Sequence, residues 1–201
     1  GQSSRVITKG EDKTRRNIAV HEVGHFLIEY HHAMLVSGGD ILKAKDITRI
    51  LKISSESIAQ VGVLGFVMRE QTEEVMLQNV EDMEWDVKQL YGGIAAEELV
   101  CGKNGCTTGG ADDIKKATRL LQHMVVENSV YSTSKLNYEM LESKEHQIQT
   151  IEEKSKDFYE ESMRILKENE LLLLHLSGVL MEDWSLSKDE IFEEILGFNS
   201  Y

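Results

Sequence analysis

The stretch "IAVHEVGHFLIEYHH", residues 18–32, contains two histidines four positions apart, His21 and His25, with Glu22 directly after the first. Four residues make slightly more than one helical turn, so both imidazoles would project from one side of a helix over residues 13 to about 30. This H-E-x-x-H pattern is typical of zinc peptidases, in which the histidines bind the metal and the glutamate accepts a proton from water. Because so short a pattern also arises by chance, it identifies a zinc site only together with further evidence from the rest of the sequence.

The composition of the chain excludes several classes of function. With 201 residues, 41% of them hydrophobic and 28% charged, it is a globular chain of one domain or two small ones. A formal net charge of -13 and the lack of any basic run argue against nucleic acid as a partner. No apolar run approaches the roughly 18 to 20 residues that span a bilayer, so we expect the chain itself to be soluble. Cys101 and Cys106 are expected to be reduced thiols.

The absence of proline removes the commonest helix breaker and favours helices along the whole chain. Two segments have a strand-like pattern instead. Residues 46–54 alternate between apolar and polar positions, and residues 61–68 are rich in β-branched residues and glycine, so we expect two or three strands there.

Helical patterns make up most of the remaining sequence. One covers residues 71–101 with an interruption at Gly92-Gly93, and another covers residues 112–126, with acidic residues in its first turn. Residues 151–196 read as two or three amphipathic helices. The sequence therefore predicts a mainly α-helical fold with a small β-sheet, a zincin-like H-E-x-x-H helix and a helical C-terminal part.

A zinc site of this kind needs a third protein ligand. His31 has the metzincin spacing H-E-x-x-H-x-x-G-x-x-H, but Ile28 occupies the position of the glycine that ends the helix in that pattern. If the helix continues, His31 points away from the other two histidines. We therefore expect His31 and His32 to be solvated residues near a helix end.

Five blocks of sequence carry a more specific signal than H-E-x-x-H alone. In chain order they are "SRVI" (4–7), "HEVGH" (21–25), "LGFVM" (64–68), "YGGIAAEELVCG" (91–102) and "TTGGADDIKKAT" (107–118). In their order and spacing the chain resembles the C-terminal peptidase domain of the FtsH-type membrane-bound AAA+ zinc metalloproteases. The likeness extends from about residue 4 to about residue 196.

The resemblance implies a third metal ligand, because the aspartate before the isoleucine of "TTGGADDI" completes the metal site in that family. This residue is Asp113. Glu97, in the "AAEE" block, is the rival ligand, and Asp112 is a further carboxylate nearby; a carboxylate that is not a ligand can orient a ligand histidine by accepting its other N–H. The expected site is one zinc per chain with one open position, in which Glu22 does the acid/base work and the ligands are His21, His25 and either Asp113 or Glu97.

The function implied by the resemblance is that of an endopeptidase domain that hydrolyses unfolded or extracted polypeptides. The substrate backbone would pair along a strand formed by Val63, Leu64, Gly65, Phe66, Val67 and Met68. Residues 1–12 would be a linker from an absent upstream ATPase module, and residues 13–201 the peptidase domain, with a helical portion from about 145. Since no Walker sequence is present, ATP would act only through that module.

The resemblance also implies a setting. Family members act in protein quality control on unfolded or membrane proteins, as homo-hexamers anchored in a membrane with this domain on the cytoplasmic side. The alternative is a non-catalytic metal-binding assembly domain of a hexameric AAA+ complex. Glu22 favours the enzyme, because a purely structural metal site has no use for a base beside it.

Overall fold

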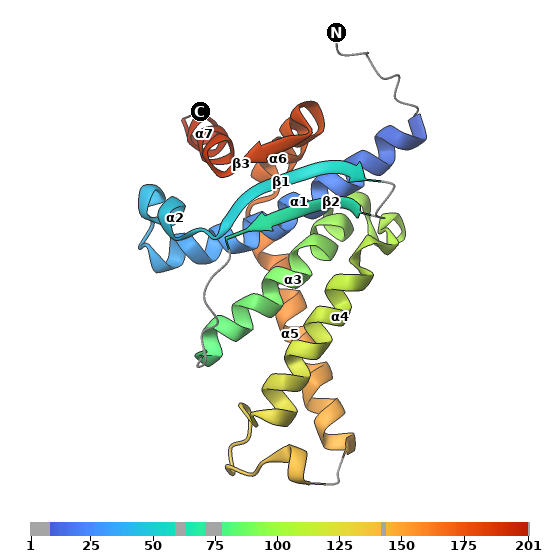
Figure 1. The fold of residues 1–201 in the computed structure, drawn as a ribbon, viewed down its shortest axis with the longest axis vertical. Coiled ribbons are helices and arrows are strands. Elements are labelled where there is room, and N and C mark those ends of the chain that lie inside the picture. Colours follow the sequence, from blue (N-terminus) through green and yellow to red (C-terminus); the bar gives the residue numbers. More distant parts are fainter. Residues whose placement is uncertain (1–8, 59–62, 71–77, 142–143, 201) are drawn as a thin grey trace.

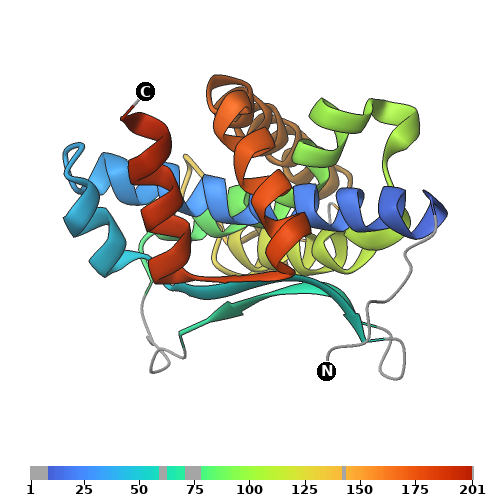
Figure 2. The ribbon, with the colours of Figure 1, turned by 90° about the horizontal axis from the view of Figure 1, so that it is seen from above.

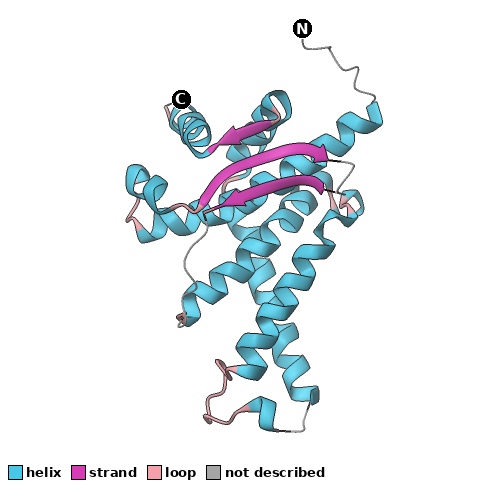
Figure 3. Cartoon of the chain, viewed as in Figure 1, coloured by secondary structure: helices cyan, strands magenta, loops and turns pink. Residues whose placement is uncertain are grey.

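The chain folds into long helices and one small sheet in a computed structural model that describes residues 9–58, 63–70, 78–141 and 144–200 (Figure 1). Helix predominates and the three strands lie together (Figure 3), which confirms the predicted fold class. The principal elements, in chain order, are α1 (Lys9–Val36), α2 (Ile41–Ile47), β1 (Ile50–Ile58), β2 (Val63–Arg69), α3 (Val80–Cys101), α4 (Ala111–Gln122), α5 (Lys144–Glu168), α6 (Glu170–Asp183), β3 (Ser185–Ser187) and α7 (Lys188–Asn199).

Helix α1 is the central element of the fold. Every residue from 17 to 28 is buried, so this middle part of the helix is enclosed on all sides rather than on one apolar face. The predicted helix over residues 13–30 is present but extends further at both ends, to Lys9 and Val36. Its buried apolar residues form a hydrophobic cluster, here called the α1 core, with residues of β1, α3, α5, α6 and α7. The H-E-x-x-H sequence therefore lies inside the molecule.

The sheet has the strand order β2-β1-β3 and is antiparallel throughout. It forms a separate layer on one side of the helices (Figure 2). The third strand, which connects α6 to α7, falls in a segment for which the sequence predicted only helices, because three residues are too few for an alternating pattern. Within the described residues β2 is an edge strand, paired with β1 along one side only. The pairs run from Ile50↔Arg69 to Ile58↔Val63 for β1 with β2, and from Lys52↔Ser187 to Ser54↔Ser185 for β1 with β3.

Helices α1 and α3 cross at two glycines. A Cβ atom on Gly24 would lie 2.3 Å from the carbonyl oxygen of Gly92 and 2.5 Å from Cβ of Ala96. The predicted interruption at Gly92-Gly93 is wrong, because α3 runs through both residues without a break. These glycines allow close helix packing instead of ending a helix. Helix α3 begins at Val80 after the N-cap residue Asn79, and residues 71–77 of the predicted helix lie outside the described residues.

An arm made of α4, α5 and the first half of α3 extends away from the sheet (Figure 1). The predicted helix over residues 112–126 is α4 with a π-helical turn added at its end, His123–Glu127. The predicted helices over residues 151–196 are α5, α6 and α7. A second hydrophobic cluster, here called the arm core, holds the arm together and consists of Met83, Val87, Tyr91, Ala117, Leu121, Met124 and Phe158. Within the described ranges, none of the helices combines the length and apolar character that a bilayer span requires.

Candidate metal centre

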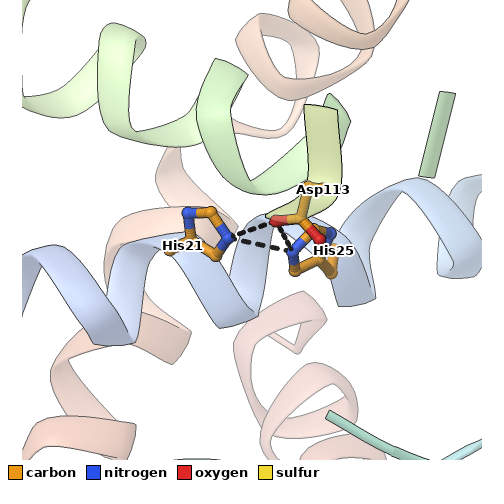
Figure 4. Close-up of side chains that lie close together, drawn as sticks. All are labelled: His21, His25 and Asp113. Atoms are coloured by element: carbon orange, nitrogen blue, oxygen red, sulfur yellow. Dashed lines mark hydrogen bonds and ion pairs between the residues drawn. The ribbon is translucent and has the colours of Figure 1, made fainter. Parts of the chain in front are cut away.

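Three side chains from two helices converge between α1 and α4 (Figure 4). His21 and His25 stand one turn apart on α1, and Asp113 lies in the first turn of α4. Nε2 of His21 and Nε2 of His25 are 3.0 Å apart, and Oδ2 of Asp113 lies 2.9 Å from the first and 3.2 Å from the second. Among the described residues, this is the one group of three or more His, Cys, Asp or Glu side chains that can hold a metal ion.

The other ring nitrogen of each histidine is held by a hydrogen bond. Nδ1 of His25 lies 2.8 Å from the backbone carbonyl oxygen of Gln89, and Nδ1 of His21 lies 2.8 Å from Oε2 of Glu97. A carbonyl or carboxylate oxygen can only accept, so both Nδ1 atoms donate. In a neutral imidazole the lone pair is then on Nε2, which is the atom that faces the other two side chains.

The converging atoms fit a divalent metal ion. Two Nε2 lone pairs and a carboxylate oxygen repel one another at these separations unless a cation or a proton lies between them. Nitrogen and oxygen ligands of a tetrahedral zinc ion lie roughly 3.3 Å from each other, given metal bonds of about 2.0–2.1 Å. The observed separations of 2.9 to 3.2 Å are a few tenths of an ångström shorter. Three protein ligands of this type also leave the fourth position open, which is typical of catalytic zinc sites.

The electrostatics of these side chains also favour a cation between them. Burial lowers the pKa of His21, but hydrogen bonds to Asp113 and Glu97 and the charge of Glu22 outweigh it and raise this pKa to about 10. Burial raises the pKa of Asp113, while its hydrogen bonds to His21 and His25 bring that pKa well below its usual range. The cluster therefore stabilises a positive charge at its centre. A metal ion would replace the proton there, so metal binding would release protons.

Glu22 lies beside the cluster and is buried. Burial raises the pKa of its carboxyl group, against the opposing effect of His25 and His21. Strand β2 passes next to it at Gly65, where an added Cβ would be 3.3 Å from Cγ of Glu22 and 2.4 Å from Cγ2 of Ile18. Gly65 also has a φ of 79°, which disfavours other residues. The predicted strand over residues 61–68 thus corresponds to an edge strand that adjoins the candidate base.

Each predicted site residue now has a position. Glu97, the rival ligand, lies behind His21 at its Nδ1 atom and is not one of the three converging side chains. Asp112 is exposed and forms an ion pair with Lys116 at 2.8 Å. The assignment of the ligands themselves stays a prediction, but the geometry favours Asp113.

The prediction that His31 and His32 are solvated residues near a helix end is wrong. Because α1 continues to Val36, these residues do not end the helix, and both are half-buried. The ring of His32 stacks on Trp85 with centroids 4.4 Å apart, and His31 lies against the same ring at 6.1 Å. Their burial lowers the pKa of both imidazoles. Neither belongs to the converging group, as the continuing helix predicted.

Sequence reasoning missed three contributors to the site. The carbonyl of Gln89 had no signal, since any residue supplies one. Thr107 donates to Glu97 from its backbone N–H at 3.2 Å and from its hydroxyl at 2.7 Å. Gly93 lies against the ring of His21, where a Cβ would be 2.4 Å from Nε2. The last two lie in the blocks "TTGGADDI" and "YGGI", so their neighbourhood was visible but their contacts were not.

Replacing Gly93 by alanine is expected to weaken metal binding at least about 10-fold. Disturbing the contacts that orient a ligand typically has an effect of this size. The new methyl group would occupy the space of the His21 ring and displace it. Metal affinity measured by competition with a chromophoric chelator checks this. Gly178→Ala on α6 is the matched control: nothing lies within 4 Å of its added Cβ, so it should leave affinity unchanged and gain about 0.5–1 kcal/mol of stability. Equal affinities in Gly93→Ala and Gly178→Ala would contradict the placement of His21.

A buried helix with H-E-x-x-H, joined by a carboxylate from a second helix, defines the class of H-E-x-x-H metallopeptidases. The comparison with protein families is more specific: residues 8–156 match the model of Peptidase family M41. The chain belongs to this family. The resemblance to the FtsH-type metalloproteases is thereby confirmed.

Individual relatives agree with the family. The ATP-dependent zinc metalloprotease FtsH of Clostridium perfringens is 28% identical over an alignment of 209 positions, gaps included, that covers 92% of this chain and 26% of that protein. FtsH 2 of a Thermoanaerobacter species is 30% identical over 186 residues, covering 90% of this chain and 32% of that protein. FtsH 4 of a Synechocystis species is 33% identical over 135 residues, covering 67% of this chain and 18% of that protein. The chain thus spans about a third or less of the length of these relatives.

Proposed function

We propose that this chain is the zinc endopeptidase domain of an ATP-dependent protease and hydrolyses peptide bonds of unfolded or extracted polypeptides. The observation that carries the proposal is the convergence of two Nε2 atoms and one carboxylate oxygen beside a buried glutamate. Family membership and the names of the relatives, which are ATP-dependent zinc metalloproteases, support it.

The proposed roles follow from position. His21, His25 and Asp113 hold one zinc ion, which when bound supplies a Lewis acid that activates water and polarises a carbonyl group. Glu22 accepts the proton of the attacking water and passes it to the leaving amine. Its raised pKa suits this work, because an acid/base group is most effective when its pKa approaches the working pH.

Two further contacts keep the histidines in the productive tautomer. Glu97 accepts a hydrogen bond from the Nδ1–H of His21, and the carbonyl of Gln89 accepts one from the Nδ1–H of His25. Such partners fix the orientation of the ring and raise the basicity of the ligand nitrogen. We therefore assign Glu97 a supporting role rather than that of a ligand.

The edge strand β2 is the proposed binding place for substrate. An extended polypeptide can add to a free strand edge through backbone hydrogen bonds, which are largely independent of sequence. Residues 63–68 offer such an edge, and Gly65 brings the strand next to Glu22. A substrate paired there would have its backbone alongside the base.

The setting of the domain is proposed by analogy with the longer relatives. Residues 1–12 would link to an upstream ATPase module that unfolds substrates, in a homo-hexamer anchored to a membrane with this domain on the cytoplasmic side. Residues 13–201 would be the peptidase, acting on unfolded and membrane proteins in quality control. In the alternative, a non-catalytic assembly domain, metal would bind but no peptide bond would be cut.

The zinc-loaded chain is expected to cut a permanently unfolded protein far faster than the same protein in its folded form. Cleavage requires an extended backbone beside the site, and opening a folded substrate costs up to its unfolding free energy of roughly 5–15 kcal/mol. The 201 residues contain no Walker sequence that would supply this work from ATP.

Digestion of one protein in both forms, without nucleotide, measures this difference. The substrate's cleavage-site sequences are identical in the two forms, so only access differs. Equal rates on both forms would refute the access argument. Cleavage of neither form, by chain that has bound zinc, would favour the assembly domain.

A further inference from the structure

A threonine outside the converging group is connected to it by an unbroken series of hydrogen bonds. The backbone N–H and the hydroxyl of Thr107 both donate to Oε1 of Glu97, at 3.2 and 2.7 Å. The other oxygen of this carboxylate, Oε2, accepts from Nδ1 of His21 at 2.8 Å. Glu97 is only 1% exposed, so protein groups rather than solvent must satisfy its charge.

The same hydroxyl also organises the entry to α4. Oγ1 of Thr107 accepts a hydrogen bond from the backbone N–H of Gly109 at 3.2 Å, as the N-cap of the short 3-10 turn Thr108–Gly110. That turn leads directly into α4, whose first turn carries Asp113. One hydroxyl group therefore contacts both the carboxylate that holds His21 and the turn that places Asp113.

We propose that Thr107 is a positioning residue for the metal centre, which fixes His21 through Glu97 and Asp113 through the turn before α4. The proposal rests on the proposed function in so far as the bound ion is zinc. Without the hydroxyl, Oε1 of Glu97 keeps only the longer backbone hydrogen bond, and the carboxylate can rotate away from His21. Loss of such supporting contacts typically weakens metal binding about 10- to 100-fold.

Thr107→Val is the direct test, because valine keeps the shape of the side chain and the backbone N–H but removes the hydroxyl. We expect zinc affinity, measured by competition with a chromophoric chelator, to fall roughly 10-fold, at the low end of this range because one donor remains. The visible absorption of the cobalt-substituted protein should change as well, since it reports the geometry of the ligands. Thr107→Ser restores the hydroxyl and should restore both properties.

Thr108→Val is the matched control, because Thr108 is an exposed neighbour in the same turn and its side chain takes no part in this series. It should bind zinc as the wild type does. If Thr107→Val lowers the melting temperature but leaves zinc affinity and the cobalt spectrum unchanged, the role of Thr107 is merely structural and the proposal is overturned. A Thr107→Ser variant as defective as Thr107→Val would overturn it too.

The metal-free protein separates this proposal from the proposed function. The proton on Nδ1 of His21 gives a nuclear magnetic resonance signal whose position reflects its hydrogen bond to Glu97. Thr107→Val should shift that signal and speed its exchange with water, and Thr107→Ser should not. Wild-type protein that takes up no zinc would refute the proposed function, whereas an unchanged signal in Thr107→Val would refute the positioning role.

Discussion

Glu22→Gln is expected to lose peptide hydrolysis while the protein still binds about one zinc ion per chain. Glutamine has nearly the same shape but cannot accept a proton, and positioned acid/base groups contribute about 10²–10⁴-fold to rates. Glu22 is not one of the three converging side chains, so its replacement leaves the ligand set intact. Digestion of an unfolded substrate, together with metal analysis of the same sample, measures both properties.

The matched control for this change is Glu29→Gln. Glu29 lies two turns further along α1 on the same side of the helix, and burial raises its pKa as it does that of Glu22. Its carboxylate accepts a hydrogen bond from the backbone N–H of Arg49, which a glutamine oxygen can also do. Near-normal activity in this variant would show that a second, half-buried carboxylate on the same side of α1 is not required. Hydrolysis that persists in Glu22→Gln would refute the assignment of the base.

Asp113→Ala is expected to abolish stable zinc binding, and proteolysis with it. Two histidines alone would remain, and they lack the negative charge that stabilises a cation at the centre of the cluster. Glu97→Ala should have a smaller effect, about 10- to 100-fold on affinity, because Glu97 contacts the metal centre only through His21. Zinc content after dialysis and affinity by chelator competition distinguish the two.

Asp112→Ala provides the control for the adjacent position. This carboxylate is exposed and paired with Lys116 in the same helix, an interaction worth little to stability. The variant should bind zinc as the wild type does. Metal retention in Asp113→Ala together with its loss in Glu97→Ala would reverse the assignment of ligand and supporting residue.

The part of this site that lies within one helix could be predicted from the sequence, whereas the contacts between residues far apart in the chain could not. His21, Glu22 and His25 are related by helical geometry within five residues, and this relation holds whatever surrounds the helix. Asp113 lies 92 residues after His21 in the chain, and α4 brings it to the site by packing against α3. The resemblance to a family pointed to it; periodicity alone did not.

Glycine is the residue type whose structural role the sequence alone indicates least well. The pair Gly92-Gly93 reads as a helix break when its neighbours in space are unknown, since glycine is a poor helix former. In the structure Gly92 makes room for α1 and Gly93 makes room for the ring of His21. The third strand was missed for a related reason, because the Ser185–Ser187 segment becomes a strand only by pairing with β1.

The candidate metal centre lies between helices of the two hydrophobic clusters described above, the α1 core and the arm core. His21 and His25 stand on the helix of the α1 core, whereas Asp113 stands on α4, which contributes to the arm core. Parts of a folded protein can open locally, and a bound ion that connects α1 to α4 would oppose such opening of the arm. At a free zinc concentration 100 times the dissociation constant, binding stabilises the closed arrangement by about 2.7 kcal/mol. An opening of the arm that separates the ligands would cost this additional free energy. The rate of amide hydrogen exchange along α4 would then report how much of the protein has bound metal. Addition of a chelator would speed exchange in the arm before it does so in the central helix α1.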